Sequence, residues 1–232
     1  MSTSNTAKRQ TARAAPELAR EKPLSRSRKS ADKRDAILRA AIEIINTRSY
    51  ALATMTEIAA SLNLRDATLY YYFANKQALV YACHLRSLER FEALLTHTDR
   101  TGETGYGKLR AFLWNMLDDS ARNGPQLYFG DHSYLEPVER EAVDSWADRL
   151  KAILERWIED GMADGSIVPC EPPLVVQLLL GQLIWLGKWV PGVPGLTAER
   201  LMTAMTTVGL GGLSAREAGR VVDAVGLEPT TR

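Results

Sequence analysis

Residues 32–79 read DKRDAILRAAIEIINTRSYALATMTEIAASLNLRDATLYYYFANKQAL, and the strongest structural signal of the chain lies in this segment. Its apolar residues recur every three or four positions in three runs, a period that predicts three helices separated by two short turns. The third run opens with polar residues and ends in aromatics. This order predicts a helix-turn-helix with a supporting first helix, a scaffold that places a short helix in the major groove of duplex DNA.

Local signals mark where these helices begin and end. The first helix is expected over about residues 32–48, where one face is apolar. The second begins at a capping box, Thr54-x-x-Glu57, in which each side chain satisfies a backbone N–H of the other residue. Asn63 supplies a turn residue that tolerates left-handed backbone geometry. The third helix is expected over residues 66–73.

Charge is distributed unevenly, although the formal net charge is only +1. Residues 1–29 carry eight basic and two acidic side chains, whereas the remainder carries 21 basic and 26 acidic ones. Such polarity orients a protein on DNA. Residues 1–29 also lack apolar anchors, so they are predicted to form a disordered basic arm. This arm is either a solvated tail or a contact to phosphates or a minor groove, and residues 26–34 are the favoured contributors.

The rest of the chain keeps the helical period and shows no sustained two-residue alternation, which predicts an all-α fold. We expect a DNA-binding domain over residues 30–80, a helical domain over 81–213 and a flexible tail over 214–232. The most apolar segment, residues 174–190, is shorter than the roughly 20 residues that span a membrane, so it is interpreted as a buried helix. Two cysteines and the absence of a leading apolar run predict a cytoplasmic protein without a secretory signal.

The final run of the quoted segment carries a specific motif, Thr68-Leu69-Tyr70-x-Tyr72-Phe73-x-x-Lys76-x-x-Leu79. With Ile37-Leu38-x-Ala40-Ala41 and Ile58-Ala59, it makes residues 32–80 resemble the N-terminal domain of TetR-family transcriptional regulators. The motifs cover about a fifth of the chain. The length and helix order of the remainder also look like the ligand-binding and dimerisation domain of that family.

The resemblance implies a set of DNA contacts. The amino end of the third helix would reach base edges, while the two threonines of the second helix, the tyrosines and the lysine would meet phosphate, sugar or a thymine methyl. Two of the tyrosines, at positions 70 and 72, could instead pack partly against the first helix. The residues implied are Thr54, Thr56, Arg65, Asp66, Ala67, Thr68, Tyr70, Tyr71, Tyr72 and Lys76.

Two positions depart from the family pattern. Asn63 stands where a glycine is usual, and Arg65 stands where a serine or threonine commonly caps the third helix. Asp66 is the alternative cap, which would move the helix start by one residue. Next to DNA, Arg65 offers bidentate recognition of guanine, and Asp66 can accept a hydrogen bond from cytosine N4.

A single helix-turn-helix buries too little surface for selective binding in a genome. The resemblance therefore implies a homodimer on a palindromic operator, whose half-sites lie about 34–36 Å apart. The apolar helix over 174–190 and a last helix capped by Thr197 are expected to pair with their mates. The alternative is that both helices belong to the core of one subunit.

Large side chains of the second half predict an apolar effector pocket. Residues 185–189 and 195–197 faintly resemble members that sense acyl-CoA thioesters, so an apolar or aromatic effector, acyl-CoA included, is expected to release a repressor from its operator. Polar candidates are Tyr128, His132, Gln182 and Lys188. The predicted pocket residues are Trp114, Phe129, Tyr134, Trp146, Trp157, Trp185 and Trp189.

Other classes of function find less support. The three histidines lack metal-ligand spacing, and there is neither a glycine-rich phosphate loop nor a nucleophile motif, so we predict no cofactor and no enzyme activity. A redox-responsive DNA-binding protein would use Cys83, which is predicted to be buried and inert. Activation instead of repression stays open, because DNA contact does not fix its consequence.

Overall fold

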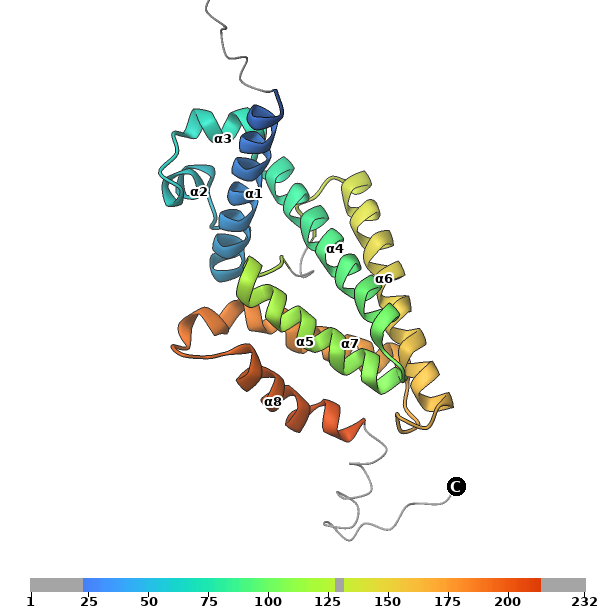
Figure 1. Cartoon of the computed structure of the whole chain (residues 1–232). Helices are drawn as coiled ribbons and strands as arrows, with labels where there is room; N and C mark the ends of the chain where they lie inside the picture. Colours follow the sequence, from blue (N-terminus) through green and yellow to red (C-terminus); the bar gives the residue numbers. More distant parts are fainter. Residues whose placement is uncertain (1–22, 128–131, 214–232) are drawn as a thin grey trace, which may run out of the picture.

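The structure, a computed structural model, describes residues 23–127 and 132–213 (Figure 1). Over these ranges the chain is all-α, with eight α-helices, two short 3-10 helices and no β-strand. Three parts of these expectations lie outside the described residues: positions 1–22 of the arm expected over 1–29, the pocket candidates Tyr128 and Phe129, and the tail expected over 214–232.

Three helices form the predicted helix-turn-helix unit: α1 (Pro23–Arg48), α2 (Met55–Ser61) and α3 (Asp66–Tyr72). Their inward faces close around a small core, as the apolar spacing predicts. The fully buried members of this core include Ile37, Ile42, Ile58, Ala59 and Leu69. The short α3 therefore has one face fixed by packing and the other exposed.

Helix α1 begins at Pro23, about nine residues before the expected start. Residues 23–29, which the sequence pattern assigns to a disordered arm, are therefore helical. Proline suits a first helical position, since it lacks the N–H that a helix start leaves unpaired. Once the packed part of α1 has formed, each added residue also gains a backbone hydrogen bond without a new nucleation cost. The basic segment next to the helix-turn-helix is thus a helical extension.

Helix α4 (Lys76–Thr101) belongs to both halves of the molecule. Its first turns contribute Leu79, Val80 and Cys83 to the core of the helix-turn-helix unit. From Leu88 onward its apolar residues belong to a second, larger core. The expected domain boundary near residue 80 is therefore a change of packing partner inside one continuous helix. A tilt of α4 would displace both halves together.

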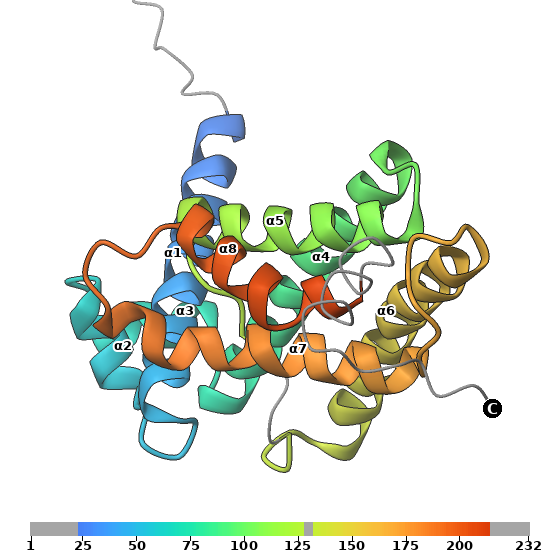
Figure 2. The ribbon, with the colours of Figure 1, turned by 90° about the horizontal axis from the view of Figure 1, so that it is seen from below.

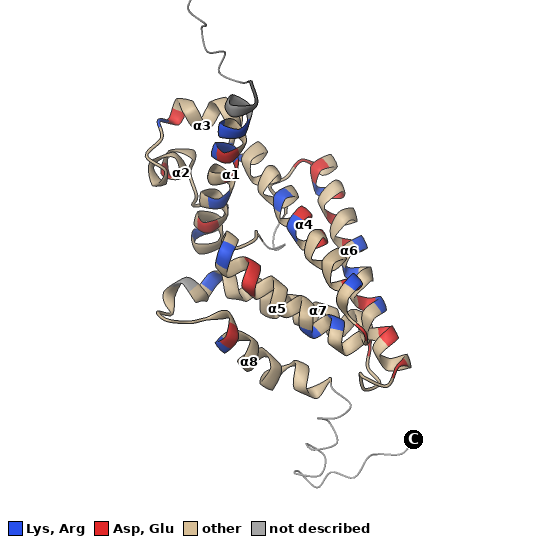
Figure 3. Ribbon diagram, in the orientation of Figure 1, with Lys and Arg blue, Asp and Glu red and all other residues tan. Residues whose placement is uncertain are grey.

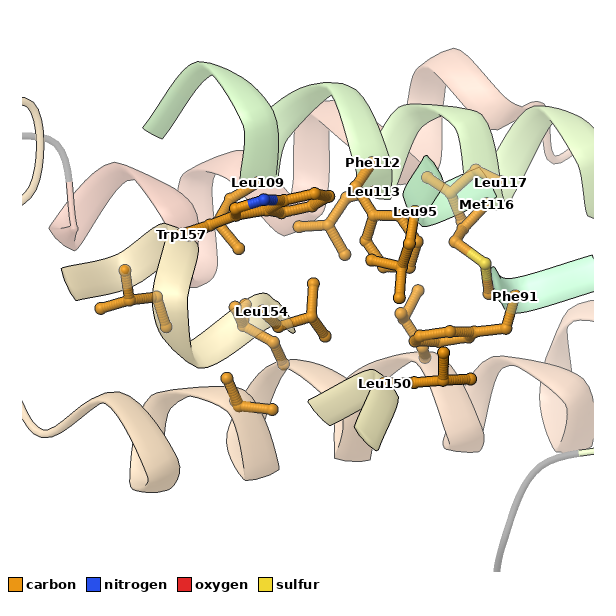
Figure 4. Close-up of a cluster of buried hydrophobic side chains, with 14 of the residues drawn as sticks. Phe91, Leu95, Leu109, Phe112, Leu113, Met116, Leu117, Leu150, Leu154 and Trp157 are labelled. Carbon is orange, nitrogen blue, oxygen red and sulfur yellow. The ribbon is translucent and has the colours of Figure 1, made fainter. Parts of the chain in front are cut away.

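The second core lies among α4, α5 (Gly105–Asn123), α6 (Pro137–Ala163) and α7 (Pro172–Trp189), with α8 (Ala198–Val208) against α5 (Figures 1 and 2). Short 3-10 helices follow α7 at Val190–Gly192 and α8 at Leu210–Gly212. At its centre the ring of Phe112 packs edge-on against Phe91, at 5.0 Å between centroids, and against Trp157, at 6.1 Å (Figure 4).

Gly105 allows α5 to approach α6 closely. A Cβ atom added at Gly105 would lie 2.2 Å from the carbonyl oxygen of Trp157 and 2.3 Å from the amide nitrogen of Gly161. Gly161 lies inside α6, which continues to Ala163. A Cβ atom added at Gly161 would lie 2.5 Å from Ile167 Cδ1, so this glycine leaves room for the Ile167 side chain.

Helix α7 has one buried and one exposed face, so its interpretation as a buried helix holds for one side only. Val176, Leu179 and Leu183 face the core, while Leu178 and Trp185 are exposed. None of the helices within residues 23–127 and 132–213 is both long enough and apolar enough to cross a membrane.

Candidate nucleic-acid interface

The turn between α2 and α3 has the geometry predicted for Asn63. This residue has a φ of 53°, in the left-handed region that asparagine tolerates better than most residues. The amide of Leu64 donates to the carbonyl oxygen of Ala59 at 2.9 Å and closes the turn. The crossing of the two helices is thus fixed by backbone bonds, and the absence of the usual glycine does not disturb it.

The start of α2 shows half of the predicted capping box. The Thr54 hydroxyl oxygen accepts from the amide of Glu57 at 3.1 Å, as expected. The Glu57 carboxylate, however, lies 2.7 Å from the guanidinium of Arg48 at the end of α1. A charged partner offers a stronger hydrogen bond than a neutral amide. Glu57 therefore joins α2 to α1, and the Thr54 hydroxyl can still donate to a phosphate.

A side-chain hydrogen bond fastens the first turn of α2 to the first turn of α3. The Thr56 hydroxyl donates to Asp66 Oδ2 at 2.6 Å. Arg65 occupies the N-cap position of α3 without a side-chain capping bond within the described ranges, so the alternative cap by Asp66 is wrong. Thr56 and Asp66, both predicted to contact DNA, are therefore hydrogen-bonded to each other. Thr56 could donate to phosphate only after giving up this bond.

The outer face of α3 collects most of the predicted base-reading residues. Arg65, Asp66 and Ala67 are exposed at its amino end, and Thr68 is half-buried. Tyr71 is 82% exposed, and its ring meets that of Tyr72 edge-on at 5.2 Å between centroids. The buried Leu69 anchors the opposite face. Such a short, rigid helix with an exposed polar and aromatic face is what a major groove accepts.

The aromatic end of α3 lies against α1. Tyr70 is half exposed, whereas Tyr72 is partly buried and its hydroxyl accepts from Ser30 Oγ at 3.4 Å. The alternative that Tyr72 packs against the first helix is thus partly realised. The contact also brings the basic start of α1 next to the recognition surface.

Exposed cations on the first described turns of α1 extend this surface. Arg28, Lys29 and Lys33 are exposed, and Figure 3 shows basic residues on the part of α1 that adjoins α3. Sequence reasoning assigned the first two to a disordered arm, because charge and low hydrophobicity hide helical continuity. Their helical placement adds positive charge beside the place where the phosphate backbone would pass.

The Lys76 ammonium contacts groups of the protein itself, whereas the resemblance implies only a contact to phosphate. Its ammonium donates to the carbonyl oxygens of Ala53 at 2.8 Å and Ala51 at 3.5 Å, and it lies 4.2 Å from the centre of the Tyr50 ring. Burial lowers the pKa of Lys76 from its ordinary value. An ammonium has three N–H donors, so one is left for a phosphate oxygen. The phosphate contact stays a prediction.

A stack of rings connects this lysine to the second half of the molecule. The Tyr50 ring lies parallel to that of Tyr134, at 3.8 Å between centroids. The Tyr134 hydroxyl lies 2.9 Å from Nε2 of His84 on α4. Burial, followed by the nearby charge of His132, lowers the pKa of His84 to about 3. His84 is therefore a neutral ring in the folded protein at neutral pH.

Of the predicted aromatic pocket residues that the structure describes, only Tyr134 and Trp185 meet in one hollow, of about 570 Å³, which the polar candidate Lys188 also lines. Trp157 is fully buried and donates its indole N–H to Asp99 at 2.8 Å, while Trp185 is 65% exposed on α7. Trp189 is also exposed on α7, and Trp114 and Trp146 are half-buried at the edge of the larger core. These indoles therefore have several separate roles.

Two further hollows lie between helices of the second half. One, of about 350 Å³, is lined by residues of α5, α7 and α8 and is called here the α5–α7–α8 hollow. The other, of about 400 Å³, is lined by residues of α4, α6 and α7 and is called the α4–α6–α7 hollow. No predicted aromatic residue within the described ranges lines either hollow, although His132 lines the second. Which helices form a hollow depends on long-range packing that spacing alone does not reveal.

The exposed side of α7 forms an apolar stripe made of Leu174, Leu178 and Trp185. Gly181 lies between them, and a Cβ atom added there would meet open space. On α8, Val208 is also exposed. Figure 3 shows few charged residues on α7 and α8, in contrast to α6. Such a stripe is typical of a surface that another protein chain covers.

The redox alternative finds no support in the surroundings of Cys83. This thiol is fully buried and lies 3.8 Å from the carbonyl oxygen of Leu38, and burial raises its pKa to about 12. A buried thiol with a raised pKa is inert towards oxidants. Within the described part of the chain, no group of three or more His, Cys, Asp or Glu side chains could hold a metal ion.

Comparison with known proteins agrees with this geometry. The profile of a family described as bacterial regulatory proteins, tetR family, matches residues 37–83, and that of a tetracyclin repressor-like C-terminal domain matches residues 102–213. YhgD, an uncharacterized HTH-type transcriptional regulator of Bacillus subtilis (strain 168), is 24% identical over 191 residues, which cover 80% of this chain and 99% of YhgD.

Solved structures share the fold. AibR in complex with isovaleryl coenzyme A and operator DNA is 25% identical, with a TM-score of 0.64, and the match covers 79% of this chain and 98% of AibR. KstR2, a ketosteroid transcriptional regulator of Mycobacterium tuberculosis, is 18% identical, with a TM-score of 0.66 and coverage of 78% and 95%. The second likeness concerns the fold alone.

Proposed function

Because the chain belongs to the TetR family of DNA-binding transcriptional regulators, we propose that it is a homodimeric repressor of a palindromic operator, released by an apolar small molecule. The observation that carries this proposal is the pairing of an exposed recognition helix with an uncovered apolar stripe on α7. The first feature suits a groove of DNA and the second suits a second subunit.

In the proposed complex, α3 enters the major groove. Arg65, Ala67 and Thr68 at its amino end read base edges, with Tyr71 beside them, because side chains at the start of a recognition helix reach deepest. The backbone contacts come from the rim of the surface. They are proposed for Thr54, Tyr70, Lys76 and the exposed cations at the start of α1, while Thr56, Asp66 and Tyr72 mainly hold the surface in shape.

The dimer follows from the size of this interface. One small unit cannot supply the affinity and selectivity of a genomic repressor. Two units held by a twofold axis can contact half-sites about 34–36 Å apart. The stripe of Leu174, Leu178 and Trp185 would be covered by its mate on a partner chain, with Gly181 permitting close approach of the helices.

An effector would act by preferring one arrangement of the dimer. AibR binds both isovaleryl coenzyme A and operator DNA, which supports an effector with a short apolar group here. Since α4 is shared by both cores, a tilt of α4 would change the separation of the two recognition helices. The shift cannot exceed the difference in effector affinity between the two arrangements.

A charged substitution in the stripe tests this proposal. Leu178→Glu should convert the dimer to a monomer in sedimentation and weaken binding to a selected duplex at least a hundredfold, since it puts a carboxylate in an apolar interface. Val138→Glu makes the same change at an exposed valine on α6 and should leave both properties unaltered. A wild-type monomer, or a Leu178→Glu variant that remains dimeric, would refute the proposed assembly.

A further inference from the structure

The α5–α7–α8 hollow has the walls of a small-molecule site. Residues of α5, α7 and α8 line it, and Figure 2 shows α8 running between the other two helices. Its buried lining includes Met116, Leu117 and Leu183. Ser120 and Thr197 bring hydroxyl groups to it, and none of the described lining residues is charged. Sites for small ligands are typically hollows of roughly 300–1,000 Å³ with mostly apolar walls and few polar groups.

This hollow and the dimer stripe use opposite faces of α7. Leu183, Leu186 and Val190 line the hollow at intervals of three and four residues, as one helical face requires. Leu178 and Trp185 point to the exposed face. A molecule in the hollow therefore touches α7 from within the subunit, and the proposed partner touches it from outside.

Two walls of the hollow contact the last turns of α1. Gly187 lines the hollow, and a Cβ atom added there would lie 3.2 Å from Asn46 Nδ2. Pro125 also lines it, and Asn46 Nδ2 donates to the carbonyl oxygen of the next residue, Gln126, at 2.9 Å. Lys188 Nζ donates to the carbonyl oxygen of Thr47 at 3.2 Å.

We propose that the α5–α7–α8 hollow binds a compact, uncharged apolar effector and that Asn46 transmits its binding to the DNA-binding unit. An occupant that moves α7 or the segment around Pro125 must displace Asn46, because this amide contacts both walls. The route runs from α7 to α1 and is separate from a tilt of α4. The inference rests on the proposed function, since it assumes that effector binding weakens operator binding.

The α4–α6–α7 hollow is less suited to such a molecule. Asp144, Asp148 and Lys151 contribute to its walls. An apolar occupant would remove water from these charges without replacing their hydrogen bonds, which costs free energy. The two hollows are similar in size, so chemistry rather than volume distinguishes them.

A neutral dye tests the site. The probe is 6-propionyl-2-dimethylaminonaphthalene, whose emission moves to the blue in apolar surroundings, titrated into the full-length protein. Ala198→Phe narrows the α5–α7–α8 hollow and should weaken dye binding at least tenfold, whereas the same change at Ala147 in the α4–α6–α7 hollow should alter it less than twofold.

If Ala198→Phe does not fold, as judged by its thermal melt, Ala121→Phe replaces it on the exposed rim of the same hollow. Wild-type affinity in a folded variant of either kind, or weakening by Ala147→Phe alone, would overturn the assignment of the site. The same applies if the wild-type protein does not bind the dye.

The second arm tests the route through Asn46 on a duplex selected from random sequences. Saturating dye should weaken duplex binding by wild-type protein at least tenfold. Asn46→Ala should bind the dye within twofold of wild type and lose the effect on the duplex. Asn115→Ala is the matched control, because its amide donates to Thr98 within the second core, and it should keep the effect.

Dye binding without any change in duplex affinity of the wild-type protein would overturn the proposed transmission, as would an Asn46→Ala variant that responds fully. If no duplex is selected at all, the proposed function fails, while the dye titrations still decide whether the hollow is a site.

Discussion

The helix-turn-helix unit and the second half of the molecule are each stabilised by a different kind of internal contact. In the helix-turn-helix unit, short polar links such as Thr56 to Asp66 and Lys76 to nearby carbonyls set the surface around a small core. In the second half, large rings such as Trp157 and Phe112 fill a larger core, and hollows remain between helices. The first arrangement favours a rigid surface for DNA, and the second leaves room for a ligand.

The largest effect is expected where the second half is most tightly packed. Trp157→Ala should lower the free energy of unfolding by about 3–5 kcal/mol, because it empties a fully buried site. Tyr71→Ala, on the exposed face of α3, should change it by less than about 0.5 kcal/mol. Urea denaturation followed by circular dichroism measures both. Equal losses for the two variants would remove the contrast between the halves.

Acid should destabilise the junction between the halves through His84. Its pKa is lowered to about 3 by burial, whereas in the unfolded chain it is about 6.5, so the unfolded chain binds more protons between these values. The contribution of the neutral His84 ring to stability is therefore complete well above pH 6.5. It falls as the pH is lowered towards 3, by about 2 kcal/mol between pH 7.5 and 5.

The test is a set of denaturation curves over that range for wild type and for His84→Gln, which should show a flatter dependence. His97→Gln removes an exposed histidine and should follow the wild type. If the His84→Gln curve keeps the wild-type slope, the neutral buried histidine is not the cause.

Substitutions on the DNA-binding surface should distinguish base recognition from non-specific electrostatic binding. Arg65→Ala should change discrimination among selected duplexes by roughly 1–3 kcal/mol, because it removes a side chain aimed at base edges. Arg28→Ala, at the start of α1, should weaken all duplexes about equally and flatten the salt dependence by about one unit of slope. Fluorescence anisotropy at several salt concentrations measures both. A uniform loss for Arg65→Ala would exclude base reading by this residue.

The smallest effect concerns the cap of α2. Thr54→Ala should cost about 1 kcal/mol of stability, since the amide of Glu57 loses its acceptor, and Thr54→Ser should restore most of it. Thermal melts of the two variants measure this difference. A serine variant as weak as the alanine variant would show that the hydroxyl bond is unimportant.

Sequence reasoning succeeded where local rules govern the structure. The left-handed Asn63, the cap at Thr54 and the apolar faces of the three helices all follow from residues within a few positions. The same rules placed Thr197 as the cap of α8. Helices and turns can therefore be predicted from the sequence, because their hydrogen bonds join residues only a few positions apart.

It failed where a residue's role depends on distant neighbours. The Lys76 ammonium donates to a carbonyl oxygen more than twenty positions earlier in the sequence. The Thr56 hydroxyl donates to Asp66 on the other side of a turn. Trp157 and Trp185 are the same residue type, but the first lies in the core and the second on the surface. Only the packing of whole helices decides between these environments. The candidate effector site was missed for that reason, because its lining is aliphatic and gathered from separate helices.

The most direct test of the account is the number of chains bound to a duplex selected from random sequences, measured by sedimentation of the complex. We expect a pseudo-palindromic site occupied by two chains, with the half-sites on one side of the double helix. Selection of an asymmetric site bound by one chain, or no selection at all, would contradict it.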